Sequence, residues 1–274
     1  DLVSSWRHWS FYRSRKYPRV KKRLTIIEGL IIVEHATTML PIHTERGRAM
    51  KRWETGGGHV IHRLMGGVGN VYALRHGDDM LLVDTGRIYG WKTLFSRIEG
   101  LDRKVRPKAL VLTHSHFDHA ENAAAVKTIF GAKIIVHRSE ADFLNSGDSP
   151  LPQGTIFPTR WLIRLFGASL QRRFLYRPAA GDILVDQGLD LLDFGFSATV
   201  LHLPGHSSGS LSLIAENEIA LVGDTLFGVI RGSVRPPFAD DTALLVRSWR
   251  RLLDTGCRVF LPGHGRPIGR DLLQ

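Results

Sequence analysis

Three histidines and an aspartate stand within the six residues His114-Ser115-His116-Phe117-Asp118-His119, immediately after a short apolar run. Imidazole nitrogens and carboxylate oxygens are the ligands that zinc and similar divalent cations prefer in proteins. In an extended segment leaving a strand, His114 and His116 point the same way, and Asp118 and His119 follow where the chain turns into a helix. The spacing therefore predicts a metal-binding loop. His114 and His116 can face one cation, and Asp118 and His119 can face a second cation beside it.

Three further places repeat the pattern of an apolar run that ends beside glycine in a potential ligand. They are His206 after Leu203-Pro204-Gly205, Asp224 after Val222-Gly223, and His264 after Leu261-Pro262-Gly263. Glycine lets the backbone come close to a shared centre. Together with the first cluster these residues suffice for two metal sites, and two cations about 3.5 to 4 Å apart form a recognised hydrolytic device.

Short strands alternate with helices from His59 onward, and these elements must position the ligands. Strands are predicted at His59–Met65, Val71–Arg75, Met80–Asp84, Lys108–Thr113, Lys133–His137, Ala198–Leu203, Ser210–Ala215, Ile219–Val222 and Arg258–Leu261. Helices are predicted at Tyr89–Ile98, Ala120–Phe130 and Asp241–Leu253. This alternation indicates an α/β sandwich.

The net charge of +11 is unevenly distributed along the 274 residues. Residues 1–49 hold ten basic and four acidic residues. We therefore expect residues 1–55 to be a basic N-terminal extension that could be poorly ordered or non-native, followed by a catalytic domain over residues 56–274. A basic arm also keeps nucleic acid or a membrane surface open as a partner, although we favour a small molecule.

A segment at about residues 148–182 interrupts the alternation of strands and helices. It contains five arginines and prolines on either side of an apolar run, Trp161-Leu162-Ile163-Arg164-Leu165-Phe166. We interpret it as a helical insertion, which is either a lid over the site or an amphipathic helix packed on the body.

The sequence offers little support for secretion or a membrane span. Cys257 is the only cysteine, so no intrachain disulfide can form. The apolar stretch Leu24–Val33 is far shorter than the roughly 20 residues of a spanning helix. We expect a cytoplasmic protein, with secretion and the oligomeric state, a homodimer included, left open.

The complete ligand series resembles the metallo-β-lactamase superfamily over roughly Gly57 to Ile268. The series runs His114-x-His116-x-Asp118-His119, then His206, Asp224 and His264, with the strand Leu81-Leu82-Val83-Asp84 upstream. The resemblance implies a four-layer αββα sandwich with the site at the edge of its two sheets. It also implies one cation on His114, His116 and His206, a second on Asp118, His119 and His264, and Asp224 as the bridge.

The resemblance further implies two divalent cations, Zn²⁺ in the first place and Mn²⁺ or Fe²⁺ as alternatives. Cations that share a water lower its pKa, so a bridging hydroxide would attack the substrate. Asp118 could relay a proton, and Asp84 is similar to the aspartate that orients a metal-bound histidine from behind.

A bridging aspartate separates this chain from the antibiotic-degrading branch, where the pattern places cysteine or serine. Gly223-Asp224-Thr225-Leu226-Phe227 resembles glyoxalase II. Lactonases usually carry tyrosine where Phe227 stands. Glyoxalase II carries a C-terminal helical region that binds glutathione, for which the ten residues given after His264 are too few, so neither branch fits fully. Phe227, Arg231, Arg235, Trp161 and Arg164 are the candidate substrate residues, and their arginines favour an anionic or amphiphilic substrate.

The sequence thus predicts a dinuclear metal-dependent hydrolase of an ester, thioester or lactone. A mono-iron persulfide dioxygenase and a nucleic-acid phosphodiesterase are the alternatives on the same scaffold. Hydrolysis of β-lactams is expected to be a promiscuous activity at most.

Overall fold

The structure, a computed structural model, describes residues 50–274 and two strands within the first 49 residues. These strands, β1 (Leu24–Ile27) and β2 (Leu30–Val33), pair antiparallel and lie within the apolar stretch predicted to be too short for a membrane span. The remainder of the predicted basic extension up to residue 49 lies outside the described residues. Residues 1–49 and 50–274 are two compact units, and the second contains every candidate ligand.

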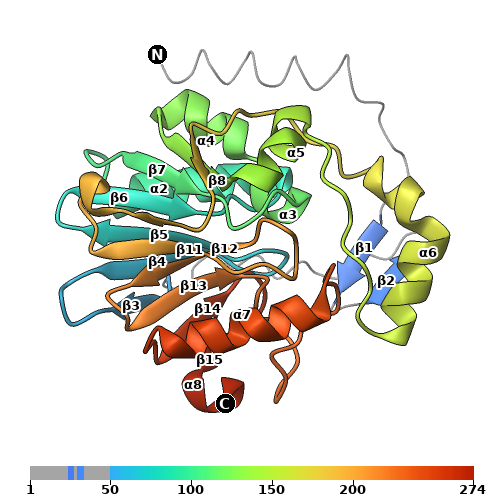
Figure 1. Ribbon diagram of the computed structural model, residues 1–274. Coiled ribbons are helices and arrows are strands. Elements are labelled where there is room, and N and C mark those ends of the chain that lie inside the picture. Colours follow the sequence, from blue (N-terminus) through green and yellow to red (C-terminus); the bar gives the residue numbers. More distant parts are fainter. Residues whose placement is uncertain (1–23, 28–29, 34–49) are drawn as a thin grey trace. The chain divides into compact units, whose positions relative to one another are not determined.

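Two β-sheets form the body of this second unit (Figure 1). The first sheet contains, in spatial order, β3 (Arg52–Glu54), β4 (Val60–Met65), β5 (Val71–His76), β6 (Asp79–Val83), β7 (Pro107–Val111), β8 (Lys133–His137) and β9 (Ile183–Val185). The second contains β10 (Gly188–Asp190), β11 (Ala198–His202), β12 (Leu211–Ala215), β13 (Ile219–Gly223), β14 (Val259–Pro262) and β15 (Ile268–Gly269).

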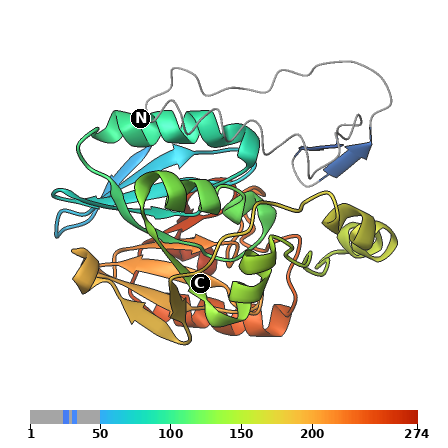
Figure 2. The same cartoon turned by 90° about the horizontal axis from the view of Figure 1, so that it is seen from above.

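Helices lie on the outer face of each sheet, and the helix over residues 157–171 lies to one side of them, as Figures 1 and 2 show. The helices are α2 (Trp91–Leu101), α3 (Phe117–Ala120), α4 (Ala123–Phe130), α5 (Ala141–Ser146), α6 (Phe157–Gln171), α7 (Thr242–Asp254) and α8 (Arg270–Leu273), with 3₁₀ turns at Ile88–Gly90, Arg138–Glu140 and Leu192–Phe194. Helices α2 and α4 pack on the first sheet. Trp249 and Leu252 of α7 pack on the second. The predicted four-layer αββα sandwich is confirmed.

The main core lies between the sheets, where the inward side chains of both exclude water. It includes Leu74 and Leu81 of the first sheet and Leu213 and Leu221 of the second, all fully buried. Burying a side chain of this size stabilises the folded state by about 1.5 to 3 kcal/mol. This rigid double layer fixes where the strands end.

The strands that precede candidate ligands all end at one edge of the sandwich. In the first sheet β6, β7 and β8 run parallel, and in the second β13 and β14 do. Strand β11 has the same direction as β13 because both are antiparallel to β12. Carboxyl ends of strands with one direction converge, which is where open α/β sheets place their sites.

One predicted helix is interrupted, and the structure shows why. In the segment expected to be helical over Ala120–Phe130, Ala120 ends α3 and α4 begins at Ala123, with Glu121 and Asn122 between the two helices. The Asn122 amide donates to the carbonyls of Thr85, Gly86 and Arg87, at 2.9, 3.1 and 3.0 Å. The buried Asn122 side chain therefore bonds to the loop after β6 at the point where the two helices are separated.

Several short elements were not predicted. Strands β3, β9 and β10 have three residues each, too few for an alternating pattern to show. Strand β3 pairs with β4, so residues 52–54 are part of the larger unit. No helix in the described part of the chain has the length and apolarity needed to cross a bilayer.

Candidate metal centre

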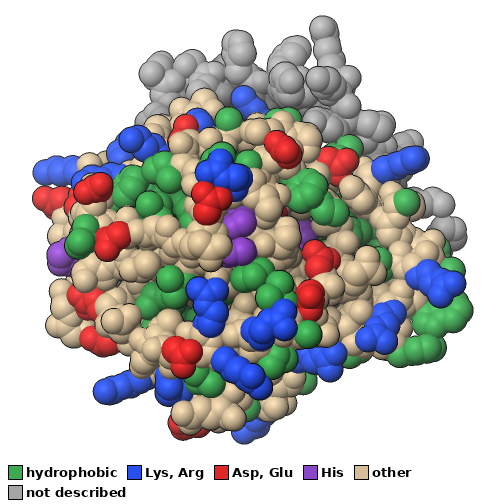
Figure 3. All heavy atoms as spheres, viewed as in Figure 1, with side chains coloured by type: hydrophobic (Ala, Val, Ile, Leu, Met, Phe, Trp, Pro, Cys, Tyr) green, Lys and Arg blue, Asp and Glu red, His purple; other side chains and the backbone are tan. Residues whose placement is uncertain are grey.

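The seven predicted ligands meet at the edge where the strands end. Their nitrogen and oxygen atoms form three overlapping groups within 4.8 Å, each able to hold a metal ion. The groups are His114 with His116 and His206, His114 with His119 and Asp224, and Asp118 with His119 and His264. Figure 3 shows histidine side chains reaching the surface near the middle of one face.

Asp84 anchors two of these histidines from behind. One oxygen of its carboxylate is 2.8 Å from Nδ1 of His119. The other accepts the backbone N–H of Thr113 at 2.8 Å, and the Thr113 hydroxyl also donates to the carboxylate. That hydroxyl is 3.0 Å from Nδ1 of His114. With Nδ1–H donating backward in both rings, the Nε2 lone pairs of His114 and His119 face the centre.

A backbone carbonyl orients the histidine that comes from the second sheet. His206 Nδ1 is 2.9 Å from the Phe238 oxygen, which can only accept, so this nitrogen carries the proton. His206 Nε2 then presents its lone pair and lies 3.1 Å from Nδ1 of His116. In the same way His119 Nε2 lies 3.3 Å from Nε2 of His264.

Two buried atoms at the centre are unsatisfied. Nε2 of His114 and Oδ1 of Asp224 have no hydrogen-bond partner among the described residues. Leaving a buried polar atom unpaired costs about 1 to 3 kcal/mol. Converging lone pairs and a carboxylate oxygen without a donor are the set that a divalent cation satisfies, so these residues fit a metal centre.

The charges of the centre also suit a cation. Burial and the neighbouring histidines hold the pKa of His114 well below its ordinary value, and burial with His206 lowers the pKa of His116 to about 4. Burial would lower the pKa of His119 too, but Asp84, Asp224 and Asp118 raise it to about 10. These carboxylates therefore favour a second proton on the His119 ring. A metal ion bound at Nε2 would replace that proton and supply the positive charge instead.

A glycine is required where β14 ends. A Cβ at Gly263 would lie 2.4 Å from Oδ1 of Asp224 and 2.6 Å from Cε1 of His119. Any side chain there would displace two candidate ligands. The glycine beside His264 in the sequence therefore serves close approach, as predicted.

The predicted substrate residues lie in different surroundings. Phe227 is at the centre, with its ring 5.3 Å from that of His264. Arg235 donates to the Thr155 oxygen at 3.3 Å, and Arg231 is exposed. Trp161 is half exposed on α6, and Arg164 lines a cavity beside that helix. Which of them touches a substrate remains a prediction.

Glu140 is a structural residue that sequence reasoning missed. It is buried, and one of its oxygens accepts the Ser115 N–H at 3.0 Å and the Ser115 hydroxyl. The other accepts the Gly209 N–H at 3.1 Å. Glu140 therefore joins the loop that carries His114 and His116 to the loop that carries His206. Its position three residues after β8, a strand that ends at the same edge as the ligand-bearing strands, could have indicated that it lies near the site.

The insertion is attached to the same loop. The Tyr176 hydroxyl donates to the Ser115 carbonyl at 2.6 Å. Phe174 stacks on Phe117, with ring centroids 3.9 Å apart and planes 7° from parallel. The chain after α6 thus packs directly on the candidate metal loop.

Comparison with known proteins identifies the family. The model of the metallo-beta-lactamase superfamily matches residues 64–264. The chain belongs to this superfamily. It is therefore a metal-dependent hydrolase, as the sequence predicted.

Curated relatives include two thioester hydrolases. Hydroxyacylglutathione hydrolase GloC of Haemophilus influenzae is 33% identical over 174 residues, which are 63% of this chain and 74% of that protein. Human acyl-coenzyme A thioesterase MBLAC2 is 27% identical over 216 residues, 74% of this chain and 75% of the relative.

Solved structures show the same fold. The B3 metallo-beta-lactamase BLEG-1 aligns with a TM-score of 0.58 at 23% identity, covering 81% of this chain and 94% of that one. TTHA1623, solved in a di-iron-bound form, aligns with a TM-score of 0.53 at 26% identity, covering 76% and 94%.

Proposed function

We propose that this protein is a dinuclear metal-dependent thioester hydrolase. The observation that carries the proposal is the set of three overlapping ligand groups, in which His114 Nε2 and Asp224 Oδ1 have no hydrogen-bond partner within the described part of the chain. The two thioester-hydrolysing relatives support the substrate class, and the di-iron form of TTHA1623 supports two cations.

His114, His116 and His206 would hold one cation, and Asp118, His119 and His264 the other. Asp224 is suited to bridge them, because its Oδ1 lies 3.4 Å from His119 Nε2 while its Oδ2 lies 3.4 Å from His264 Nε2 and 3.7 Å from His206 Nε2. When bound, two divalent cations lower the pKa of a water and polarise the attacked carbonyl.

The chain's own residues then orient the reaction and move a proton. Asp84 and Phe238 hold the His119 and His206 rings in place through their Nδ1 atoms. Asp118 is ionised, because His119 and a hydrogen bond from His264 outweigh burial and lower the pKa of its carboxyl. It can accept the proton of the attacking water and deliver it to the departing sulfur. Water thus cleaves the C–S bond to give a carboxylic acid and a thiol.

The test is a panel of purified substrates. An uncharged acyl-N-acetylcysteamine, an acyl-coenzyme A and an acyl-glutathione are compared with a lactone and a phosphodiester, with thiol release as the thioester readout. We expect turnover of at least one thioester, abolished by chelation and restored by Zn²⁺, Mn²⁺ or Fe²⁺. Failure to release thiol from any thioester by protein shown to contain two cations would contradict the proposal. Iron content with oxygen uptake on glutathione persulfide would instead support the dioxygenase alternative.

A further inference from the structure

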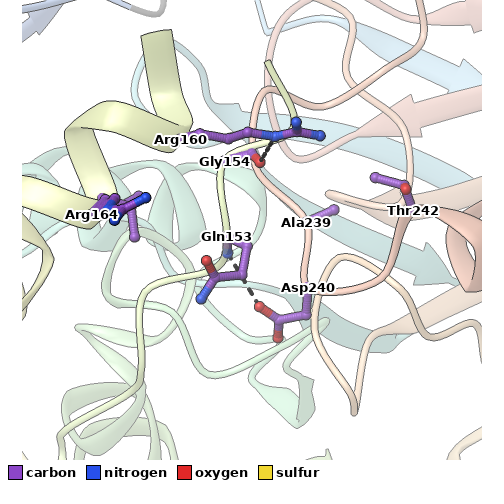
Figure 4. Close-up of a pocket in the computed structure, with 8 residues that line it drawn as sticks. Gln153, Gly154, Arg160, Arg164, Ala239, Asp240 and Thr242 are labelled. Atoms are coloured by element: carbon purple, nitrogen blue, oxygen red, sulfur yellow. Dashed lines mark hydrogen bonds between the residues drawn. The ribbon is translucent and has the colours of Figure 1, made fainter. Parts of the chain in front are cut away.

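A cavity of about 570 Å³ lies beside the insertion, outside the seven candidate ligands. Figure 4 shows Arg160 and Arg164 on the α6 side, and Asp240 and Thr242 on the segment that leads into α7. Gln153 and Gly154 form the wall between them. The cavity therefore lies between the insertion and the segment that precedes α7.

The cavity shares a wall with the candidate metal centre. Phe238, which accepts from His206 Nδ1, immediately precedes the cavity residues Ala239 and Asp240. The Asp240 N–H also donates to the His206 carbonyl at 3.1 Å. On its other side this segment is bonded to the start of the insertion, since the Ala239 N–H donates to the Gln153 oxygen at 2.8 Å. A molecule in the cavity thus lies one peptide segment from a candidate ligand.

The cavity carries an excess of positive charge. Arg160 and Arg164 are one helical turn apart on α6, and both line the cavity, with Arg160 reaching past Gly154 toward the opposite wall (Figure 4). Within the part of the chain that the structure describes, no carboxylate forms a salt bridge with either, and residues 149–180 contain no acid. Arg160 Nε donates to the Gly154 oxygen, which orients its guanidinium.

One acidic side chain, Asp240, also faces the cavity. Its carboxylate already accepts the Gln153 N–H at 3.3 Å. The acid is therefore partly committed to the wall, and the two guanidiniums remain the groups able to bind a ligand.

We infer that this cavity binds the anionic part of the thiol carrier of the substrate, a phosphate or a carboxylate. Guanidinium groups bind both anions in bidentate geometry. The inference rests on the proposed thioester hydrolysis, because carrier thiols such as coenzyme A and glutathione bear these anions at a distance from the sulfur. It assigns substrate specificity to the insertion and bond cleavage to the metal centre.

The test compares charged and uncharged thioesters in two matched double variants. Arg160→Gln with Arg164→Gln removes the cavity charges, while Arg172→Gln with Arg173→Gln removes two exposed charges just after α6. For the anionic thioesters we expect the first variant to raise KM about tenfold or more. Its KM and kcat for the acyl-N-acetylcysteamine should equal those of the wild type, and the control variant should match the wild type throughout. An equal change in KM for charged and uncharged thioesters would overturn the inference.

Direct binding separates this inference from the proposed function. Thiol-free probes, adenosine bisphosphate for the phosphate and S-methylglutathione for the carboxylate, are titrated calorimetrically into each protein. Binding of one probe that is lost in the Arg160/Arg164 variant alone supports the cavity even if no thioester is hydrolysed, and the identity of that probe distinguishes the two anions. Equal binding by the two variants, or no binding of either probe to the wild type, would refute it.

Discussion

The candidate metal centre and the insertion differ most in how their side chains are held. His114 and His119 are 1% and 0% exposed, and each has one ring nitrogen tied to a residue behind it. On α6, Phe157 and Leu165 are 73% and 59% exposed. The metal centre is held by the ends of strands from two sheets. The insertion is a helix whose flanking segments attach it to the rest of the unit.

On the proposed function, the two regions would have different roles within one unit: the metal centre would cleave the bond and the insertion would bind the substrate. A reaction centre needs atoms held to a fraction of an ångström, and the double sheet supplies that rigidity. Recognition of a substrate needs a surface that can differ between relatives without disturbing the core, and an insertion supplies that. The two meet at Ser115, which Glu140 and Tyr176 contact from opposite regions.

The strongest way to test the comparison is to damage the centre alone. Asp224→Asn keeps the shape of the side chain and removes its charge between the two ligand groups. We expect kcat for thioester hydrolysis to fall about a thousandfold, because several kcal/mol of transition-state stabilisation depend on the cations. Metal content should fall below two ions per chain. The exposed Asp193→Asn is the control, and a kcat within tenfold of the wild type in Asp224→Asn would contradict the assignment.

The second largest effect is expected from Glu140, which joins the two ligand-bearing loops behind the centre. Glu140→Gln places an amide N–H₂ against either the Ser115 or the Gly209 N–H, since both carboxylate oxygens accept hydrogen bonds. We expect the free energy of unfolding, measured by urea denaturation, to fall by about 2 kcal/mol. Glu54→Gln, which removes only an exposed ion pair with Arg52, should change it by less than about 0.5 kcal/mol. Equal losses in the two variants would show that Glu140 does not join the loops.

The attachment of the insertion to the centre is the third test. Tyr176→Phe removes only the hydroxyl that donates to the Ser115 carbonyl. The free energy of unfolding should fall by about 1 kcal/mol, the net value of one such bond. Tyr89→Phe, at a ring that is 69% exposed, should leave it unchanged. If both variants are as stable as the wild type, the hydroxyl contact contributes nothing to holding the insertion.

The smallest effect should come from Asp182, the last residue of the insertion, which attaches the insertion to α4 and β8. Asp182 pairs with Lys127 at 2.6 Å and accepts the Ile134 N–H at 2.8 Å, contacts that outweigh burial and lower the pKa of its carboxyl. Its stabilisation is therefore complete above its ordinary pKa of 3.8 and is lost as pH falls through the lowered value. Asp182→Asn should lower the free energy of unfolding by less than about 1 kcal/mol near neutrality. Denaturation at a series of pH values should show this difference vanish in acid, and a constant difference would exclude the carboxylate as its cause.

The architecture was predictable because its main strands are continuous apolar runs that end at glycine or at a potential ligand. Strand β8 matches the predicted Lys133–His137, and the predicted strands Val71–Arg75 and Met80–Asp84 form the hairpin of β5 and β6, which turns at Gly77 with a φ of +56°. All seven candidate ligands meet because each follows such a strand. The positions of these residues along the chain are therefore enough to predict the ligand set, because the sheets bring the ends of the strands together.

The contacts behind the site could be predicted only in part: the family resemblance implies that Asp84 orients a histidine, but not the backbone conformation that allows it. Asp84 has a φ of +61°, which turns its carboxylate back toward Thr113 and His119, and no pattern in the sequence indicates that conformation. Glu140 stands among polar residues typical of a solvated turn, yet it is buried against a loop 25 residues earlier in the chain. Such long-range hydrogen bonds depend on tertiary packing, so only the folded structure reveals them.

The most direct test of the central claim is a metal titration of protein stripped by a chelator. Zn²⁺, Mn²⁺ or Fe²⁺ is added in increments, and bound metal and thioester hydrolysis are measured on the same samples. The arrangement of His114, His116 and His206 beside Asp118, His119 and His264, with Asp224 between them, predicts two bound ions per chain and hydrolysis that requires both. Saturation at one ion with full activity, or hydrolysis by the stripped protein, would contradict it.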